Sequence, residues 1–149
     1  MNKHDRLKQM VTGNQKALLV RLVFAIPVGI LLFLFLQSET QSLLYGGLII
    51  VALLAYGLTV IRESRFMSGF TERVRAKRII HAQYLFDYMM VVFICFFFPL
   101  LMRLGTISWI PFLVFSFTAM AMLFVDRLLD EKVKRLDPEQ PTRREVRGW

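Results

Sequence analysis

RESRFMSGFTERVRAKRIIHAQ, residues 62–83, is the stretch that decides how this chain folds. It holds six lysines and arginines and two glutamates, and it lies between two pairs of long apolar runs. A segment with so many charges is excluded from the hydrocarbon core of a lipid bilayer, whereas the apolar runs on either side are suited to it. The pattern therefore predicts a connection outside the bilayer between two transmembrane hairpins.

The four apolar runs are long enough to cross a bilayer as helices. They cover residues 17–36, 43–61, 84–102 and 107–125. A helix of about 20 residues spans the roughly 30 Å hydrocarbon core. The fold class that we expect is therefore all-α: a polytopic membrane protein with four transmembrane helices in two hairpins.

The polar segments divide the chain into five parts. We expect a cytoplasmic N-terminal segment (1–16), a first transmembrane hairpin (17–61), a basic cytoplasmic connection (62–83), a second transmembrane hairpin (84–125), and a cytoplasmic helix extension with a disordered tail (126–149). Gly13 and Asn14 are expected to separate a short surface helix from the first span, and Asn14 is expected to be the N-cap of that span. Pro138 and Pro141 are expected to stop the last helix near Leu136.

The composition favours a membrane protein over a nucleic-acid-binding one. Of the 149 residues, 56% are hydrophobic, whereas about 45–50% is usual in soluble domains. The formal net charge is +8, which in a soluble domain would suggest nucleic acid. Because the basic residues cluster at the ends of the apolar runs, membrane topology explains them, and no nucleic-acid partner is expected.

Lysine and arginine are unevenly distributed over the segments that flank the apolar runs. Five lie in residues 1–21, six in 62–83 and seven in 126–149, whereas 37–41 hold none and 103–105 hold one. With 18 of the 19 on one side, the positive-inside rule predicts that this side, including both termini, is cytoplasmic. The predicted location is a cell membrane, taken to be a bacterial plasma membrane, and the lipid bilayer is the first expected partner.

Two ion pairs are expected where the spans cross the inner membrane boundary. Arg21 and Asp87 each lie a few residues into the first and third spans, which enter the bilayer from the same side. Arg62 and Asp126 end the second and fourth spans at matching levels. Because paired charges tolerate this boundary better than isolated ones, we predict the structural pairs Arg21–Asp87 and Arg62–Asp126. The alternative is that these residues form a gated or protonatable site.

A set of aromatic and basic residues in the connection is a candidate contact surface. Phe66, Phe70 and Val74 recur at four-residue spacing, which would place them on one stripe of a helix. The basic residues that follow are Arg73, Arg75, Lys77 and Arg78. Such a helix would lie on the inner membrane surface and contact anionic lipid headgroups or a partner, but a solvated loop explains the same residues.

Motifs for catalysis, metal binding and cofactor binding are missing from the sequence. The two histidines, His4 and His81, have no ligand-spaced partners, and the one cysteine, Cys95, lies inside an apolar run. We expect no enzyme activity, no metal and no cofactor. The leading hypothesis is a non-enzymatic accessory, regulatory or immunity-type protein that acts at the cytoplasmic membrane face, with another membrane protein or a second copy of the chain as further partners.

The alternative function is a subunit of an oligomeric pore or small transporter, holin-like in its size and basic tail. One expectation argues against a route through a single chain. Four helices that carry bulky phenylalanine and leucine side chains should pack to a filled interior.

Overall fold

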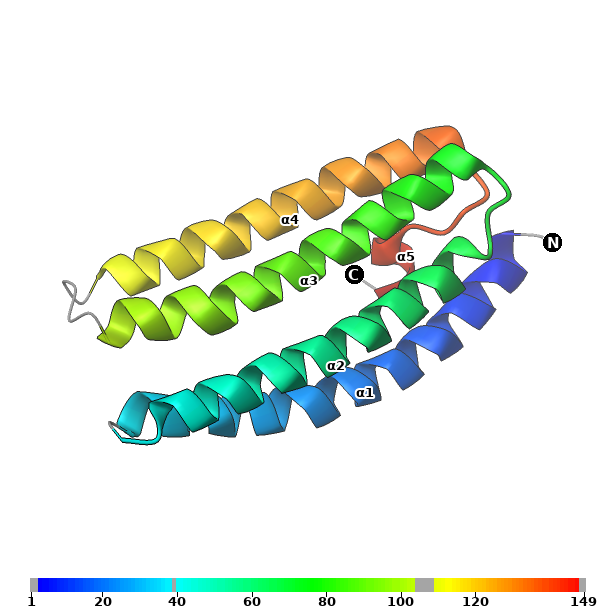
Figure 1. Ribbon diagram of the computed structural model, residues 1–149. Helices are drawn as coiled ribbons and strands as arrows, with labels where there is room; N and C mark the ends of the chain where they lie inside the picture. The colour runs from blue at the N-terminus through cyan, green and yellow to red at the C-terminus, as the bar shows by residue number, and fades with distance from the viewer. Residues whose placement is uncertain (1–2, 39, 104–108, 148–149) are drawn as a thin grey trace.

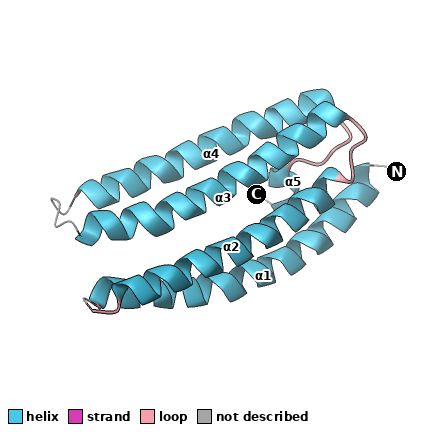
Figure 2. Ribbon diagram, viewed as in Figure 1, coloured by secondary structure: helices cyan, strands magenta, loops and turns pink. Residues whose placement is uncertain are grey.

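The chain forms five helices and their connecting turns in the residues described, which are 3–38, 40–103 and 109–147 of this computed structural model. The helices are α1 (Lys3–Gln37), α2 (Ser42–Ser68), α3 (Val74–Arg103), α4 (Ile110–Leu136) and α5 (Arg143–Arg147). Figure 2 shows only helices and loops in the described part of the chain. The prediction of an all-α fold is confirmed.

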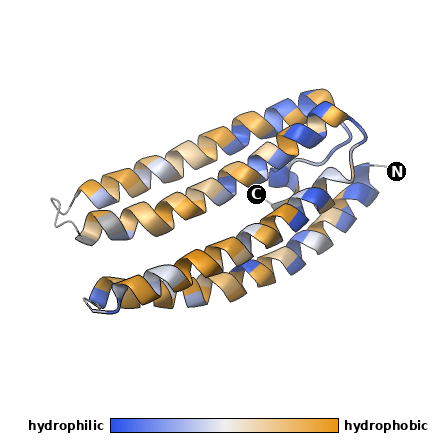
Figure 3. Ribbon diagram, in the orientation of Figure 1, coloured by the Kyte–Doolittle hydropathy of each residue, from blue (hydrophilic) through white to orange (hydrophobic). Residues whose placement is uncertain are grey.

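The four long helices are arranged as two antiparallel hairpins, α1 with α2 and α3 with α4 (Figure 1). The hairpins pack against each other along α2 and α3, and α5 lies between them at one end. Hydrophilic residues gather at that end, as Figure 3 shows. We term it the charged end; it comprises the first turns of α1 and α3, the last turns of α2 and α4, and α5. The opposite end, where α1 joins α2, is termed the turn end.

Helices α1 to α4 are each long and apolar enough to cross a membrane, by length and composition. Many of their large apolar side chains face outward: Leu19, Phe117 and Leu123 are 65%, 77% and 73% exposed. Such surfaces suit lipid, because hydrocarbon tails surround them instead of water. The prediction of four spans in two hairpins is confirmed by the length, the composition and the pairing of these helices. The predicted start of the fourth span, at residue 107, and the outer turn at 104–105 lie outside the described residues.

Helix α1 runs without interruption through Gly13 and Asn14, so the predicted break at these residues is wrong. A Cβ atom placed on Gly13 would overlap the ring of Phe66 on α2. The glycine therefore allows the two helices to approach closely, and this packing overrides its low helix propensity.

The connection between the hairpins is shorter than the predicted 62–83. Helix α2 continues to Ser68 and α3 begins at Val74, so that residues 69–73 alone form the turn. The amide of Gly69 closes α2 by donating to two carbonyl oxygens in its last turn. The basic stretch is therefore mostly the ends of two spanning helices.

The predicted stripe of Phe66, Phe70 and Val74 does not lie on one helix, because α2 ends between the first two residues. Phe66 is 45% exposed on α2, and Val74 is 63% exposed at the start of α3. Phe70 lies in the turn and packs against the buried cluster of the charged end. The two phenylalanine rings contact each other edge to face, with 5.1 Å between centroids. The prediction of an interfacial helix is thus wrong.

Two clusters of buried apolar side chains hold the helices together. One is at the charged end and comprises Met10, Val60, Met67, Ile80, Tyr84, Val133 and Val146. The other lies farther along the helices and comprises Val28, Ile49, Leu53 and Cys95. The first cluster takes residues from all five helices, whereas the second takes none from α4. Packing between the hairpins is therefore most complete at the charged end.

The interior is not filled along its whole length, contrary to the expectation from bulky side chains. A cavity of about 160 Å³ separates the two hairpins toward the turn end, and its lining residues are Phe35, Gly46, Ile49, Cys95, Phe96 and Phe97. Helix α4 packs mainly on α3 within the described residues. Because the hairpins meet mainly along α2 and α3, with a smaller contribution from α1, their side chains do not interdigitate as in a closed four-helix bundle.

The chain after Leu136 is ordered through residue 147, so the predicted disordered tail is wrong for this part. Residues 137–147 are termed the C-terminal segment. Asp137, Gln140 and Val146 in it are 9%, 1% and 6% exposed. The predicted end of the last long helix at Leu136 is confirmed.

Candidate functional site

One ionisable side chain from each of the five helices takes part in a group of ion pairs near the charged end. They are, from α1 to α5, Arg21, Glu63, Asp87, Asp126 and Arg143. Arg21 Nη2 lies 2.6 Å from Glu63 Oε1. Arg143 binds two carboxylates: Nη1 donates to Asp126 Oδ1 at 3.0 Å, and Nη2 donates to Asp87 Oδ2. We term these five side chains the charge network.

Both ion pairs predicted from membrane depth have the wrong partners. Arg21 pairs within its own hairpin, and Asp87 pairs with Arg143. Arg62 is exposed, and Asp126 also pairs with Arg143. Similar depth allows two charges to meet, but the rotation of each helix about its axis decides which side chains face each other. Arg143 lies in the tail that was predicted to be disordered, so no ion pair was predicted for it.

Tyr84 on α3 joins the two parts of the charge network. Its ring lies under the Arg143 guanidinium, with 4.4 Å from Cζ to the ring centroid, a separation at which a cation and a ring face attract. Tyr84 is 4% exposed and also interacts electrostatically with Glu63 and Arg21. The two sets of ion pairs therefore adjoin around one buried ring.

The surroundings of Arg143 keep it charged. Burial disfavours the guanidinium cation, but the adjacent Asp87 and Asp126 carboxylates outweigh this effect, and the pKa of Arg143 is raised above its ordinary value. An arginine with a raised pKa remains protonated at every pH at which proteins are normally handled. Arg143 is thus a permanent positive charge that joins α3, α4 and α5.

Further contacts hold the C-terminal segment against the first hairpin and the turn at 69–73. Thr71 Oγ1 donates a hydrogen bond of 2.5 Å to Asp137 Oδ2, which also lies 3.6 Å from Arg6 Nη1. Gln140 Nε2 donates to the carbonyl oxygen of Met67 at 3.4 Å. Because Arg143 of the segment also pairs with Asp87 and Asp126 on the second hairpin, the segment contacts both hairpins.

Helix α5 begins with a capping box that was not predicted from the sequence. The Glu145 amide donates to Thr142 Oγ1 at 3.3 Å, and the Thr142 amide donates to Glu145 Oε2 at 3.0 Å. The pattern Thr-x-x-Glu is a known signal of helix starts, and TRRE at residues 142–145 shows it. Lys3 Nζ binds the second carboxylate oxygen, Glu145 Oε1, at 2.8 Å.

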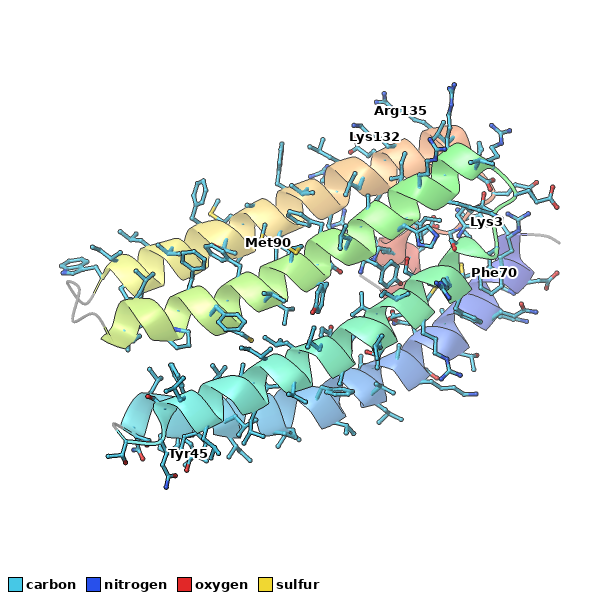
Figure 4. The ribbon with its side chains drawn as sticks, viewed as in Figure 1. Lys3, Tyr45, Phe70, Met90, Lys132 and Arg135 are labelled. Atoms are coloured by element: carbon cyan, nitrogen blue, oxygen red, sulfur yellow. The ribbon has the colours of Figure 1, made fainter. Side chains whose placement is uncertain are left out.

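The basic residues predicted as a contact surface lie outside the charge network. Arg73, Arg75 and Arg78 are exposed, and Lys77 is half-buried. Helix α4 runs antiparallel to α3, so its last turns lie beside the first turns of α3 and add exposed Lys132 and Arg135 (Figure 4). The basic face is the name used below for Arg73, Arg75, Lys77, Arg78, Lys132 and Arg135.

Ser64 on α2 and His81 on α3 form a hydrogen bond between the hairpins, with 2.5 Å from Oγ to Nδ1. Ser64 is 4% exposed, whereas His81 is exposed. A serine nucleophile needs a base that a third group orients, together with donors for an oxyanion. In the described ranges no carboxylate pairs with His81. The pair therefore acts as a contact between the helices.

No group of three or more His, Cys, Asp or Glu side chains that could hold a metal ion occurs in the described part of the chain. Comparisons with family models, curated proteins and solved structures found no match. The charged end therefore carries the two candidate functional features of this chain, the charge network and the basic face.

Proposed function

We propose that this chain is a non-enzymatic, multi-pass protein of a cell membrane, of the accessory, regulatory or immunity type, and that it acts at its charged end. In this proposal both termini lie in the cytoplasm, which agrees with the placement of 18 of the 19 lysines and arginines on that side. The basic face then lies at the inner membrane surface, where anionic lipid headgroups are its first partner.

The observation that carries the proposal is the exposure of the basic face. Its residues come from the turn at 69–73 and from the adjacent helices α3 and α4, and five of the six are exposed, whereas Arg143 and Arg21 are engaged with carboxylates. Lysines and arginines near an anionic membrane surface contribute about 1 kcal/mol each to binding. A group of this kind, fixed on helices that end at the membrane surface, is suited to hold anionic headgroups or an acidic partner.

The test compares two charge-matched variants in lipid nanodiscs that contain anionic phosphatidylglycerol and neutral phosphatidylcholine. The first replaces Arg73, Arg75, Lys77 and Arg78 with Gln, and the control replaces the exposed Lys8, Lys16, Arg62 and Arg65 with Gln. Native mass spectrometry then counts the lipids that remain bound. We expect the first variant to lose retained phosphatidylglycerol and the control to keep most of it. Equal retention in the wild type and the first variant would refute the proposal, and equal loss in both variants would show a diffuse charge effect.

The topology needs its own measurement, because it places the basic face on the cytoplasmic side. A reporter that is active only in the cytoplasm should function when fused to the C-terminus. A C-terminal reporter that is active only outside the cytoplasm would overturn the assignment.

The second candidate function, a subunit of an oligomeric pore or small transporter, gains support from one observation. The cavity of about 160 Å³ between the hairpins shows that the interior is open where a filled core was expected. A large homo-oligomer in detergent, together with ion flux in liposomes, would favour the pore. Co-purification of one stoichiometric membrane protein would favour the accessory role.

A further inference from the structure

The C-terminal segment occupies a groove that both hairpins form at the charged end. The groove is lined on the first hairpin by Met10 and Met67, and on the second by Ile80, Tyr84 and Val133. Asp87 and Asp126 are the acidic groups to which the segment binds. An apolar floor with two carboxylates is a surface that recognises an arginine beside an apolar residue.

Among the side chains that the segment places against this groove, which include the buried Pro141, three lie at a spacing of three residues. Gln140 is 1% exposed, Val146 is 6% exposed, and the Arg143 side chain is 11% exposed. By contrast, the neighbouring Arg144 and Glu145 are exposed. These three side chains are a polar, a basic and an apolar residue, with two residues between successive members.

Two observations show that the fit of the segment is incomplete. Gln140 Oε1 is buried and has no hydrogen-bond partner among the described residues. A cavity of about 20 Å³ remains between the segment and the groove, which is roughly the space of one water molecule. The segment therefore neither fills the groove completely nor receives a hydrogen bond from the described part of the protein at Gln140 Oε1.

The segment lies outside the four long helices, so its undocking would not unwind any of them. It follows the end of α4, and its helix has five residues, which is too short to be stable in water by itself. Undocking would uncover the apolar residues and both carboxylates of the groove. Such a surface is costly to leave open, so another segment of the same chemistry would be bound in its place.

We propose that this groove is a peptide-binding site, that the C-terminal segment is its built-in ligand, and that it accepts an arginine-bearing helical segment of a partner protein in exchange. The bound partner and the docked C-terminal segment exclude each other, so the docked segment also inhibits binding of the partner. The groove is a different surface from the basic face, and the proposal stands whether or not the basic face binds lipid.

The test uses the full chain in detergent micelles and a fluorescent peptide with the sequence of residues 137–147. The apparent affinity of the peptide depends on the fraction of chains whose own segment is undocked. Arg143→Ala weakens the built-in ligand and leaves the groove intact, so we expect this chain to bind the peptide about tenfold more tightly than the wild type. Arg144→Ala is the matched control, because Arg144 is the exposed neighbour, and it should behave as the wild type. A peptide that carries Arg143→Ala should not bind.

A second arm keeps the test valid if Arg143→Ala does not fold. The chain carries Cys95→Ser, Lys3→Cys and Glu145→Cys, and a short bis-maleimide joins the two new cysteines at the place of the exposed Lys3–Glu145 ion pair. Cross-linking should abolish peptide binding, and the same preparation before cross-linking should bind. Binding that is unchanged by the cross-link, equal binding to wild type and Arg143→Ala, or no binding to any of the chains would each overturn the proposal.

Discussion

Substitution of the Arg21–Glu63 ion pair tests whether an uncompensated charge between α1 and α2 destabilises this fold. The pair joins α1 to α2 at 2.6 Å, and its side chains are 29% and 10% exposed. Removal of one partner of a buried ion pair leaves an uncompensated charge and destabilises a protein by about 3–5 kcal/mol, whereas replacement of both by apolar residues is often close to neutral. Arg21→Met should therefore destabilise the chain by about 3–5 kcal/mol, because Glu63 is then left buried.

The opposite single substitution should be milder. When Glu63→Leu removes the carboxylate, the long side chain of Arg21 can extend its guanidinium toward the membrane surface. A central arginine in a transmembrane helix costs about 2.5–3.5 kcal/mol on insertion scales, and near the boundary we expect about 2 kcal/mol. The double variant Arg21→Met/Glu63→Leu should lie within about 1 kcal/mol of the wild type.

Unfolding can be followed through Cys95, which is 9% exposed and lies in the buried cluster between the hairpins. Its reaction with a thiol reagent during an SDS titration reports separation of the hairpins. The matched control is the exposed Arg127–Glu131 pair, 3.7 Å apart with side chains 73% and 54% exposed. Breaking this pair should change stability by less than about 0.5 kcal/mol. If the loss of stability in the double variant equals the sum of the losses in the two single variants, an uncompensated buried charge is not the cause of destabilisation.

Three further outcomes follow from the structure. A Cβ on Gly57 would lie 3.0 Å from the Tyr88 ring, whereas nothing lies within 4 Å of a Cβ on Gly47 in the same helix. Gly57→Ala should therefore destabilise the fold by about 1–3 kcal/mol, and Gly47→Ala should be neutral or stabilising. The reverse order of stabilities would contradict this packing. Thr142→Val removes the cap of α5, so hydrogen exchange of the α5 amides should quicken by an amount equivalent to about 1 kcal/mol, and unchanged exchange would contradict the capping role. Burial tends to raise the pKa of Glu145, but hydrogen bonds from Lys3 and the Thr142 amide outweigh this effect and lower that pKa. The resulting stabilisation is present above the ordinary carboxylate pKa and is lost as the pH falls through the lowered value, so the stability difference between the wild type and Glu145→Gln should vanish in acid. A difference that persists in acid would contradict the predicted sign.

The need of the charged residues for partners could be predicted from the sequence, but the lateral contacts that they make could not. Arg21 and Asp87 were correctly singled out as charges that need partners, because each lies close to an apolar run. Their partners come from positions that depth does not specify, Glu63 on the adjacent helix and Arg143 near the chain end. Helix rotation depends on how side chains interlock along the whole hairpin, and no short stretch of sequence records it.

The order of the spans and their all-helical character were determined by the sequence itself. The cause is local and strong, because a bilayer excludes charge and requires each spanning segment to satisfy its own backbone hydrogen bonds. The helix ends and the C-terminal segment were decided by the tertiary structure. Gly13 remains helical because its lack of a side chain lets α1 pack closely against the Phe66 ring of α2. Residues 137–147 are ordered because Arg143, Gln140 and Val146 contact residues of both hairpins. A polar tail is disordered only when nothing compensates the loss of its conformational entropy, and here the assembled charged end supplies that compensation.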